Sequence, residues 1–202
     1  MDIIEHRGHQ IEAPDMKINI PGSKISKIAQ IYGAEAWFLR PAELATDESP
    51  KLPVIRHAFL EAEKHYGVQF DVLVDMDATS PLRNVEDIVR AYRQFLDEDA
   101  EILITACPAR KNPYFNMVEK NEKGFLKLSK KLKNRPLSRQ KAPVVYQLNG
   151  LYAYDAKKFL KLKKTDFSKS IPFEIPMETG IMIDTPFEFE IVRLILENKI
   201  KK

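Results

Sequence analysis

Residues 71–83 most constrain what this chain can fold into, because an apolar run ends there in two carboxylates and a hydroxyl-rich turn. The run from Val72 to Val74 predicts a buried strand, and Pro81 closes the turn. In an open α/β sheet, ligands bind just outside the carboxyl ends of the strands. Asp77 therefore lies where a metal ion or a sugar would be held, and the sequence predicts a site here.

A helix and a second strand follow this turn. Asn84 is a candidate helix cap with Asp87 three residues on, and the apolar residues behind it have the spacing of one buried helix face. These residues are Val85, Ile88, Val89, Tyr92, Phe95 and Leu96. Residues 101–107 form the next apolar run. Strand, helix and strand in this order predict a parallel sheet.

The rest of the chain gives shorter signals. The expected elements are a helix over 25–32 ended by Gly33, a strand over 36–39, a helix over 54–62 ending near Gly67, a hairpin of 117–118 with 125–126, a strand over 146–154, a helix over 156–162, a strand over 181–184 and a final helix opened by the capping box Thr185 to Glu188. Residues 1–24 show no clear period and are expected to form a loosely structured lead-in. We expect one domain over residues 25–200.

Composition narrows the class of protein. A chain of 202 residues with 44% hydrophobic content can bury one good core, so we expect a single α/β body with a mainly parallel sheet flanked by helices. The net charge of +3 is small, and the basic residues gather mainly in 127–139 and 199–202, which favours solvated loops over nucleic-acid binding. Residues 127–145 are expected to form a long arm outside the core.

The cysteine content and the lack of long apolar runs predict a cytoplasmic protein. The single Cys107 excludes an internal disulfide. No apolar run approaches the roughly 20 residues of a membrane-spanning helix. Residues 1–16 lack the apolar core of a signal peptide. We therefore expect no membrane partner.

Two strand-end carboxylates, Asp77 and Asp184, suggest a site for Mg²⁺. This ion takes hard oxygen ligands, often one or two protein carboxylates with substrate phosphates and water. It can neutralise charge on a phosphorus while a hydroxyl attacks and pyrophosphate leaves. Asp184 directly precedes the capping box, so a role at the helix end is the alternative for that residue.

An ordered set of motifs between Ile25 and Leu196 resembles the acylneuraminate cytidylyltransferases, or CMP-sialic acid synthetases. The motifs are Tyr32-Gly33-Ala34-Glu35, residues 38–47, Thr79-Ser80-Pro81-Leu82-Arg83, Asn112-Pro113-Tyr114-Phe115, Arg139-Gln140, residues 146–150, Ile183-Asp184-Thr185 and Phe189-Glu190. The resemblance implies a nucleotide-diphosphosugar-transferase type fold, CTP as co-substrate and Mg²⁺ as cofactor. The implied reaction is attack of the anomeric hydroxyl of a sialic or other nonulosonic acid on the α-phosphate of CTP, for surface-glycan or flagellin decoration.

The resemblance also implies roles for individual residues. It assigns catalysis to Asp77, Asp184 and Arg83, with the two aspartates as metal ligands. The implied nucleotide contacts are Arg40, Thr46, Asp47 and Ser80. The implied sugar contacts are Arg139, Gln140, Tyr146 and Asn149. In the family the arm crosses to a second subunit, so a homodimer is expected.

The chain departs from the family pattern at three places. The Gly-rich basic loop that cradles the triphosphate is not found before Tyr32, although Pro21-Gly22-Ser23-Lys24 resembles its end. Met182 stands where the family has a second metal carboxylate. Asp77 replaces a glutamine that touches the sugar, and with Asp184 it would rebuild a two-carboxylate site. The alternative function is therefore a truncated, inactive relative that acts as a sugar-binding or structural dimer.

Overall fold

The computed structural model describes residues 4–6, 9–11, 23–36, 38–46 and 48–198. The chain forms two compact units. The first unit comprises residues 1–73 and 156–165, and the second comprises 74–155 and 166–202. No helix in the described ranges is long and apolar enough to cross a membrane.

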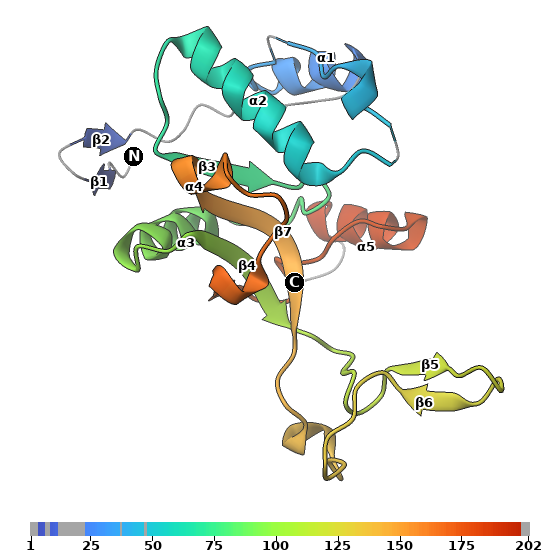
Figure 1. Cartoon of the computed structure of the whole chain (residues 1–202). Coiled ribbons are helices and arrows are strands. Elements are labelled where there is room, and N and C mark those ends of the chain that lie inside the picture. The colour runs from blue at the N-terminus through green and yellow to red at the C-terminus, as the bar shows by residue number, and fades with distance from the viewer. Residues whose placement is uncertain (1–3, 7–8, 12–22, 37, 47, 199–202) are drawn as a thin grey trace. The chain divides into compact units, whose positions relative to one another are not determined.

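The first unit is built mainly from helices (Figure 1). It contains the short paired strands β1 (Ile4–His6) and β2 (His9–Ile11), helix α1 (Ser23–Ile31), the 3₁₀ turn η1 (Ala42–Leu44), helix α2 (Lys51–Tyr66) and helix α4 (Ala156–Phe159). Phe59 of α2 packs against Phe70 and Phe159, with ring centroids 6.2 and 6.4 Å apart. The α4 segment thus joins a core formed by residues far earlier in the chain.

A four-stranded sheet in the order β3-β7-β4-β8 organises the second unit. The strands are β3 (Val72–Met76), which begins in the first unit, β4 (Ile102–Pro108), β7 (Tyr146–Asp155) and β8 (Ser170–Glu174). β4 runs antiparallel to β7 and parallel to β8. Six of the seven β4 residues are buried, because strands on both sides and helix α3 (Val85–Asp97) cover it.

Helix α5 (Pro186–Leu196) packs on the turn that follows β3. Val192 and Ile195 of α5 form a buried cluster with Leu82, and partly buried Ile181 and Ile183 pack against it. This cluster holds α5 against Leu82, in the turn that also carries Asp77.

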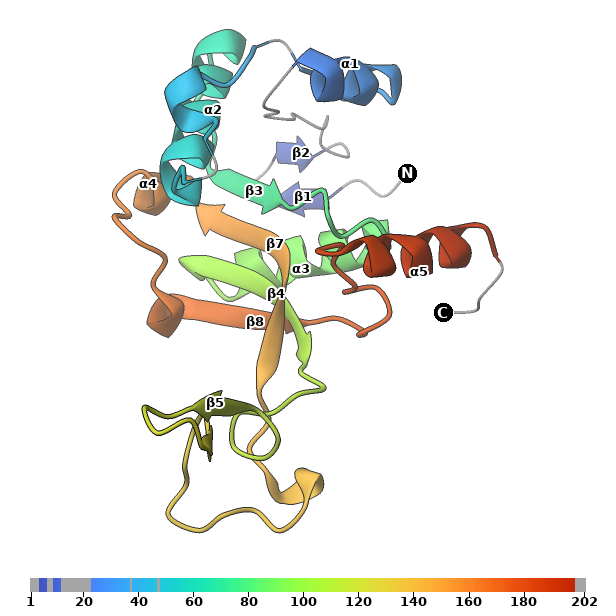
Figure 2. The same cartoon turned by 90° about the vertical axis from the view of Figure 1, so that its right-hand side faces the viewer.

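An arm formed by residues 109–145 projects from the ends of β4 and β7 (Figures 1 and 2). It contains the hairpin β5 (Val118–Lys120) and β6 (Leu126–Leu128), closed by a turn ending at Gly124, and the 3₁₀ turn η2 (Arg139–Lys141). The expected hairpin is confirmed. The basic run over 127–145 lies outside the core as expected.

Several expectations about elements are wrong in detail. The sheet is mixed, since β7 runs antiparallel to β4 while β8 runs parallel to it. The described residues of 36–39 form no strand, and Trp37 lies outside the described residues. Residues 181–184 form an extended loop, because their isoleucines pack on the α5 cluster instead of joining the sheet. β8 was not expected from the sequence.

The lead-in expected over residues 1–24 is described only in part. Residues 4–6 and 9–11 form the paired strands β1 and β2, and Ser23 already begins α1. Most of 12–24, including Pro21 and Gly22 of the expected loop remnant, lies outside the described residues. The domain boundary at residues 24 and 25 stays a prediction.

Candidate active site

Asp77 comes directly after the last β3 residue, where the chain turns toward α3. The Asp77 N–H donates to the Gly150 carbonyl at 2.7 Å, and the Asp77 carbonyl accepts from the Ser80 N–H at 3.4 Å. The side chain is half-buried. The turn therefore holds the Asp77 carboxylate at the carboxyl end of β3, as the sequence predicted.

The partner of Asp77 is a bulge in β7. Residues Ile104 and Ala106 of β4 pair with Tyr152 and Leu148, so β7 carries two extra residues in this interval. Thr105 lies opposite the extra residues. Its hydroxyl donates to the Leu151 carbonyl at 3.4 Å and accepts from the Leu151 N–H at 3.3 Å. A side chain thus takes over hydrogen bonds that the ladder loses at a bulge.

The bulge turns two carbonyl groups toward Arg83. The guanidinium donates to the Asn149 carbonyl at 2.9 Å and to the Gly150 carbonyl at 3.0 Å. Burial lowers the pKa of the Arg83 guanidinium, and the negative charges of Asp77 and Asp75 raise it in part. An arginine stays protonated in such a setting. Arg83 therefore joins the bulge to the turn after β3 and partly neutralises the carboxylates nearby.

Ser80 and Asn149 are both buried at this junction. The Ser80 hydroxyl donates to the Asn149 carbonyl at 3.3 Å, and the Asn149 amide donates to the Gly180 carbonyl at 2.7 Å. The amide nitrogen also lies 3.7 Å from the buried Cys107 sulfur. The Asn149 side chain is 0% exposed. Through its bond to Gly180 it links β7 to the loop before α5. Its contact with a sugar stays a prediction, as does the nucleotide contact of Ser80.

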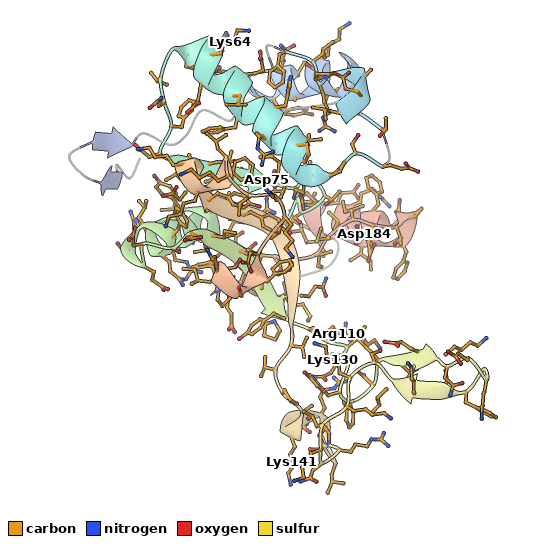
Figure 3. All side chains as sticks on the ribbon, viewed as in Figure 1. Lys64, Asp75, Arg110, Lys130, Lys141 and Asp184 are labelled. Atoms are coloured by element: carbon orange, nitrogen blue, oxygen red, sulfur yellow. The ribbon has the colours of Figure 1, made fainter. Side chains whose placement is uncertain are left out.

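Asp184 is brought to the same turn by its neighbour. The Ile183 N–H donates to the Thr79 carbonyl at 2.8 Å, two residues after Asp77. The Asp184 side chain is exposed at the start of α5, where Figure 3 labels it. Two carboxylates distant in sequence are thus held by adjoining backbone segments.

The capping box behind Asp184 is present. Thr185 accepts from the Glu188 N–H at 3.3 Å, while the Glu188 carboxylate accepts from the Asp184 N–H and the Thr185 hydroxyl, both at 2.9 Å. These hydrogen bonds lower the pKa of Glu188, the Thr185 hydroxyl contributing most. The box fixes the backbone of Asp184 and leaves its carboxylate available for a ligand.

The Glu188 bonds predict a pH dependence. A carboxyl whose pKa is lower in the folded state contributes stability above its unfolded pKa, and loses it as the pH falls through the folded pKa. We expect the free energy of unfolding to fall more for the wild type than for Glu188→Gln when the pH drops below the ordinary range of glutamate. Urea unfolding between pH 7 and pH 3 measures this difference, and identical pH profiles would contradict it.

The expected sugar residues on the arm lie apart from these carboxylates within one chain. Arg139 and Gln140 are exposed on η2. Figure 3 shows the next residue, Lys141, far from both Asp75 and Asp184 of the same unit. Tyr146, where the arm rejoins β7, donates to Glu174 of β8, and this bond raises the pKa of the phenol.

The expected nucleotide residues Arg40, Thr46 and Asp47 belong to the first unit. Arg40 is half-buried, its Nε has no hydrogen-bond partner among the described residues, and burial lowers the pKa of its guanidinium. The Thr46 hydroxyl shares a hydrogen bond of 2.8 Å with the Ser49 hydroxyl, which also accepts from the Thr46 N–H at 3.1 Å. Asp47 lies outside the described residues. The roles of these three residues stay predictions.

The donor set at the end of β3 suits a hard cation. Asp77 and Asp184 supply carboxylate oxygens, which Mg²⁺ prefers, and a substrate phosphate would supply the remaining negative charge. Gly150 lies so close that a Cβ there would be 2.6 Å from Asp77 Oδ2. Among the described residues, no three His, Cys, Asp or Glu side chains form a metal cluster.

Two solved structures share the fold of this chain. CMP:2-keto-3-deoxy-manno-octonic acid synthetase, solved with CTP, aligns with a TM-score of 0.56 and 14% identity over 89% of this chain and 79% of that one. A 4-diphosphocytidyl-2C-methyl-D-erythritol synthase from Anaerococcus prevotii aligns with a TM-score of 0.53 and 17% identity over 86% and 76%. The fold is therefore that of α/β nucleotidyltransferases, which confirms the expected fold class.

Sequence relatives then give the family. Post-translational flagellin modification protein B of Campylobacter coli is 37% identical over 183 residues, covering 90% of this chain and 77% of the relative. CMP-N,N'-diacetyllegionaminic acid synthase of Campylobacter jejuni is 38% identical over the same shares, and its pseudaminic acid cytidylyltransferase is 24% identical over 85% and 73%. No protein-family model matches the chain. The chain belongs to the CMP-nonulosonic acid synthetases, the cytidylyltransferase family that its motifs resemble.

Proposed function

We propose that this chain transfers CMP from CTP to a nonulosonic acid, giving a CMP-sugar and pyrophosphate. The observation that carries the proposal is the Asp77 turn, held against β7 by Arg83 and joined to Asp184 through the Thr79–Ile183 hydrogen bond. Relatives named as a CMP-legionaminic acid synthase and a pseudaminic acid cytidylyltransferase support the substrate class. Their alignment over most of this chain gives the inactive alternative no support.

The chemistry assigned to the chain is positioning and charge stabilisation. In this reaction the anomeric hydroxyl attacks the α-phosphorus of CTP, a new P–O bond forms, and the bond to the leaving pyrophosphate breaks. Asp77 and Asp184 would hold Mg²⁺, which supplies positive charge beside the phosphates. Arg83 joins the turn to β7 and keeps it closed, and the catalytic role that the resemblance implies for it stays a prediction. Arg40, Thr46, Asp47 and Ser80 remain the proposed nucleotide contacts.

Two of the proposed sugar contacts, Arg139 and Gln140, are assigned to a second copy of the chain. Arg139 and Gln140 lie on η2 beside Lys141, which Figure 3 shows far from Asp184 of the same unit, so we propose that each arm reaches the site of a partner in a homodimer. An arginine can grip the carboxylate of a nonulosonic acid through two parallel hydrogen bonds.

Charge favours the same dimer. Residues 109–145 hold eleven Lys or Arg and two Glu, while the whole chain has a net charge of only +3. The rest of the chain is therefore acidic, and a basic arm is complementary to it. The arm also carries Leu137 and Val144 with 89% and 69% of their surface exposed, which a partner would cover.

We place the reaction in the cytoplasm. Cys107 is a free, buried thiol, which is typical of a protein that needs no oxidising compartment.

Isothermal titration with CTP, with and without Mg²⁺, tests the proposed function. We expect CTP binding that depends on the metal, and pyrophosphate release after a nonulosonic acid such as legionaminic or pseudaminic acid is added. A folded protein that binds no CTP in the presence of Mg²⁺ would contradict the proposal.

A further inference from the structure

We propose that the β7 bulge is a positioning device for the Asp77 carboxylate, and that Gly150 is the residue on which it depends. The inference rests on the proposed function, because it assigns a purpose to Asp77 as a metal ligand. Its claim is separate: the direction of that carboxylate is set by β7, and not by the β3 turn alone.

Gly150 meets two requirements at once. Its φ is +68°, a backbone conformation that residues with a side chain rarely adopt. A Cβ built on it would lie 2.6 Å from Asp77 Oδ2, 2.8 Å from Asp77 Cβ and 2.9 Å from Asp77 Cγ. The clash is with three successive atoms of the side chain and not only with its tip. Asp77 cannot escape it by a small rotation, because its own N–H is fixed to the Gly150 carbonyl at 2.7 Å.

The bulge itself is held from three sides. Thr105 replaces the lost ladder bonds at Leu151, and Arg83 holds the carbonyls on the opposite side. Asn149 ties the bulge to Gly180, where a Cβ would lie 2.5 Å from the Asn149 amide nitrogen. Bulges are common beside active sites, where they redirect a side chain or end strand pairing. Here the redirected group is the Asp77 carboxylate, which directly follows the neighbouring strand β3.

The consequence concerns the metal affinity. Residues that orient a metal ligand typically change affinity by about 10- to 100-fold when they are mutated. A Gly150→Ala variant should therefore lose metal affinity by a factor in that range, although Gly150 supplies no ligand atom. Thr105→Val removes the hydroxyl at nearly constant volume, and should weaken metal binding by a smaller factor without a steric clash.

Two control variants separate positioning from backbone strain. Gly67 has φ +66° at the end of α2, close to the value at Gly150, but a Cβ there meets nothing within 4 Å. Gly67→Ala should impose a similar backbone strain, because its φ is similar, without any contact with Asp77. Asp77→Asn shows how much binding is lost when the carboxylate itself is removed.

The test is a titration of the purified full chain with Mn²⁺, in which electron paramagnetic resonance measures the free ion. Mn²⁺ binds the same carboxylate ligands as Mg²⁺. Circular dichroism melts accompany each variant. We expect wild type and Gly67→Ala to bind alike, Gly150→Ala to bind about 10- to 100-fold more weakly, and Thr105→Val to fall between them.

The outcomes distinguish the two claims. If Gly150→Ala and Thr105→Val bind Mn²⁺ as tightly as wild type, the positioning inference is wrong while the metal site stands. If Gly150→Ala does not fold, Thr105→Val decides by the same criterion. If wild type and Asp77→Asn bind Mn²⁺ equally, Asp77 is not a ligand, and the metal site of the proposed function is overturned together with the inference.

Discussion

Replacing Asp77 by Asn is expected to reduce CTP-dependent pyrophosphate release by about three orders of magnitude without unfolding the protein. A bound cation stabilises transition-state charge by several kcal/mol, and each 1.4 kcal/mol is about a tenfold change in rate. Asn keeps the shape of the side chain but removes the negative charge that holds Mg²⁺. The backbone hydrogen bond from residue 77 to Gly150 does not involve the carboxylate, so the turn should persist.

Asp71 offers the matched control for this variant. It precedes the same strand, its side chain is exposed, and its backbone carbonyl accepts a hydrogen bond from Ala156. Asp71→Asn makes the same change in charge at the other end of β3 and should keep wild-type activity. The measurement is kcat as a function of Mg²⁺ concentration. Full metal-dependent activity in Asp77→Asn would exclude Asp77 from the metal site.

Mixing two inactive variants is expected to restore activity if the arm acts on a partner subunit. Asp77→Asn lacks a metal ligand, and Arg139→Ala lacks the proposed sugar contact on η2. In a mixed dimer, the site of the Asp77→Asn subunit receives the Arg139→Ala arm, so it carries both defects. The site of the Arg139→Ala subunit keeps its own Asp77 and receives an arm with an intact Arg139. Random reassociation makes half of the dimers mixed, so about a quarter of wild-type activity should return.

The control for this experiment uses Arg139→Ala mixed with Gln140→Ala. Both changes lie in the same arm segment, so each mixed site still carries one arm defect and the gain should be absent. Pyrophosphate release is measured before and after unfolding and refolding of the mixture. If the mixture of Asp77→Asn with Arg139→Ala gains no activity although mixed dimers form, the arm does not complete its partner's site.

Local sequence signals predicted most helix ends correctly. Gly67 ends α2 in a left-handed conformation, and Thr185 with Glu188 opens α5 as a capping box. Both signals act within a few residues, so they can be recognised without knowing the tertiary structure. On α3 the N-cap position of Asn84 was correct, although its side chain makes no capping bond.

Elements defined by distant partners were harder to predict. Val85 has the helical spacing of a buried residue but is 73% exposed, while Asp87 is 5% exposed beside Arg90 at 2.6 Å. β8 contains Pro172, which lacks a backbone N–H, and the segment is a strand through its parallel pairing with β4. Such features depend on which segment packs alongside, and the hydrophobic pattern of one segment does not contain that information.

The site was predicted in part for the same reason. Asp77 could be found because a strand visibly ends there, whereas the role of Gly150 depends on how β7 pairs with β4. A signal was present: a glycine inside a strand pattern indicates a bulge or a close approach of backbone. The glycine stands directly after Asn149, within a run that otherwise predicts a regular strand. Its neighbour across the bulge, Thr105, gave no separate signal.

The strand order β3-β7-β4-β8 affects how the protein is made. Both neighbours of β4 are encoded after it, β7 by residues 146–155 and β8 by residues 170–174. During synthesis the most apolar strand of the sheet therefore leaves the ribosome with neither edge paired, and its edges are completed only when the chain has reached Asp155 for β7 and Glu174 for β8. Helix α3 precedes β4 and packs on it, so it can cover β4 in that interval, and the sheet is complete only when β8 has emerged.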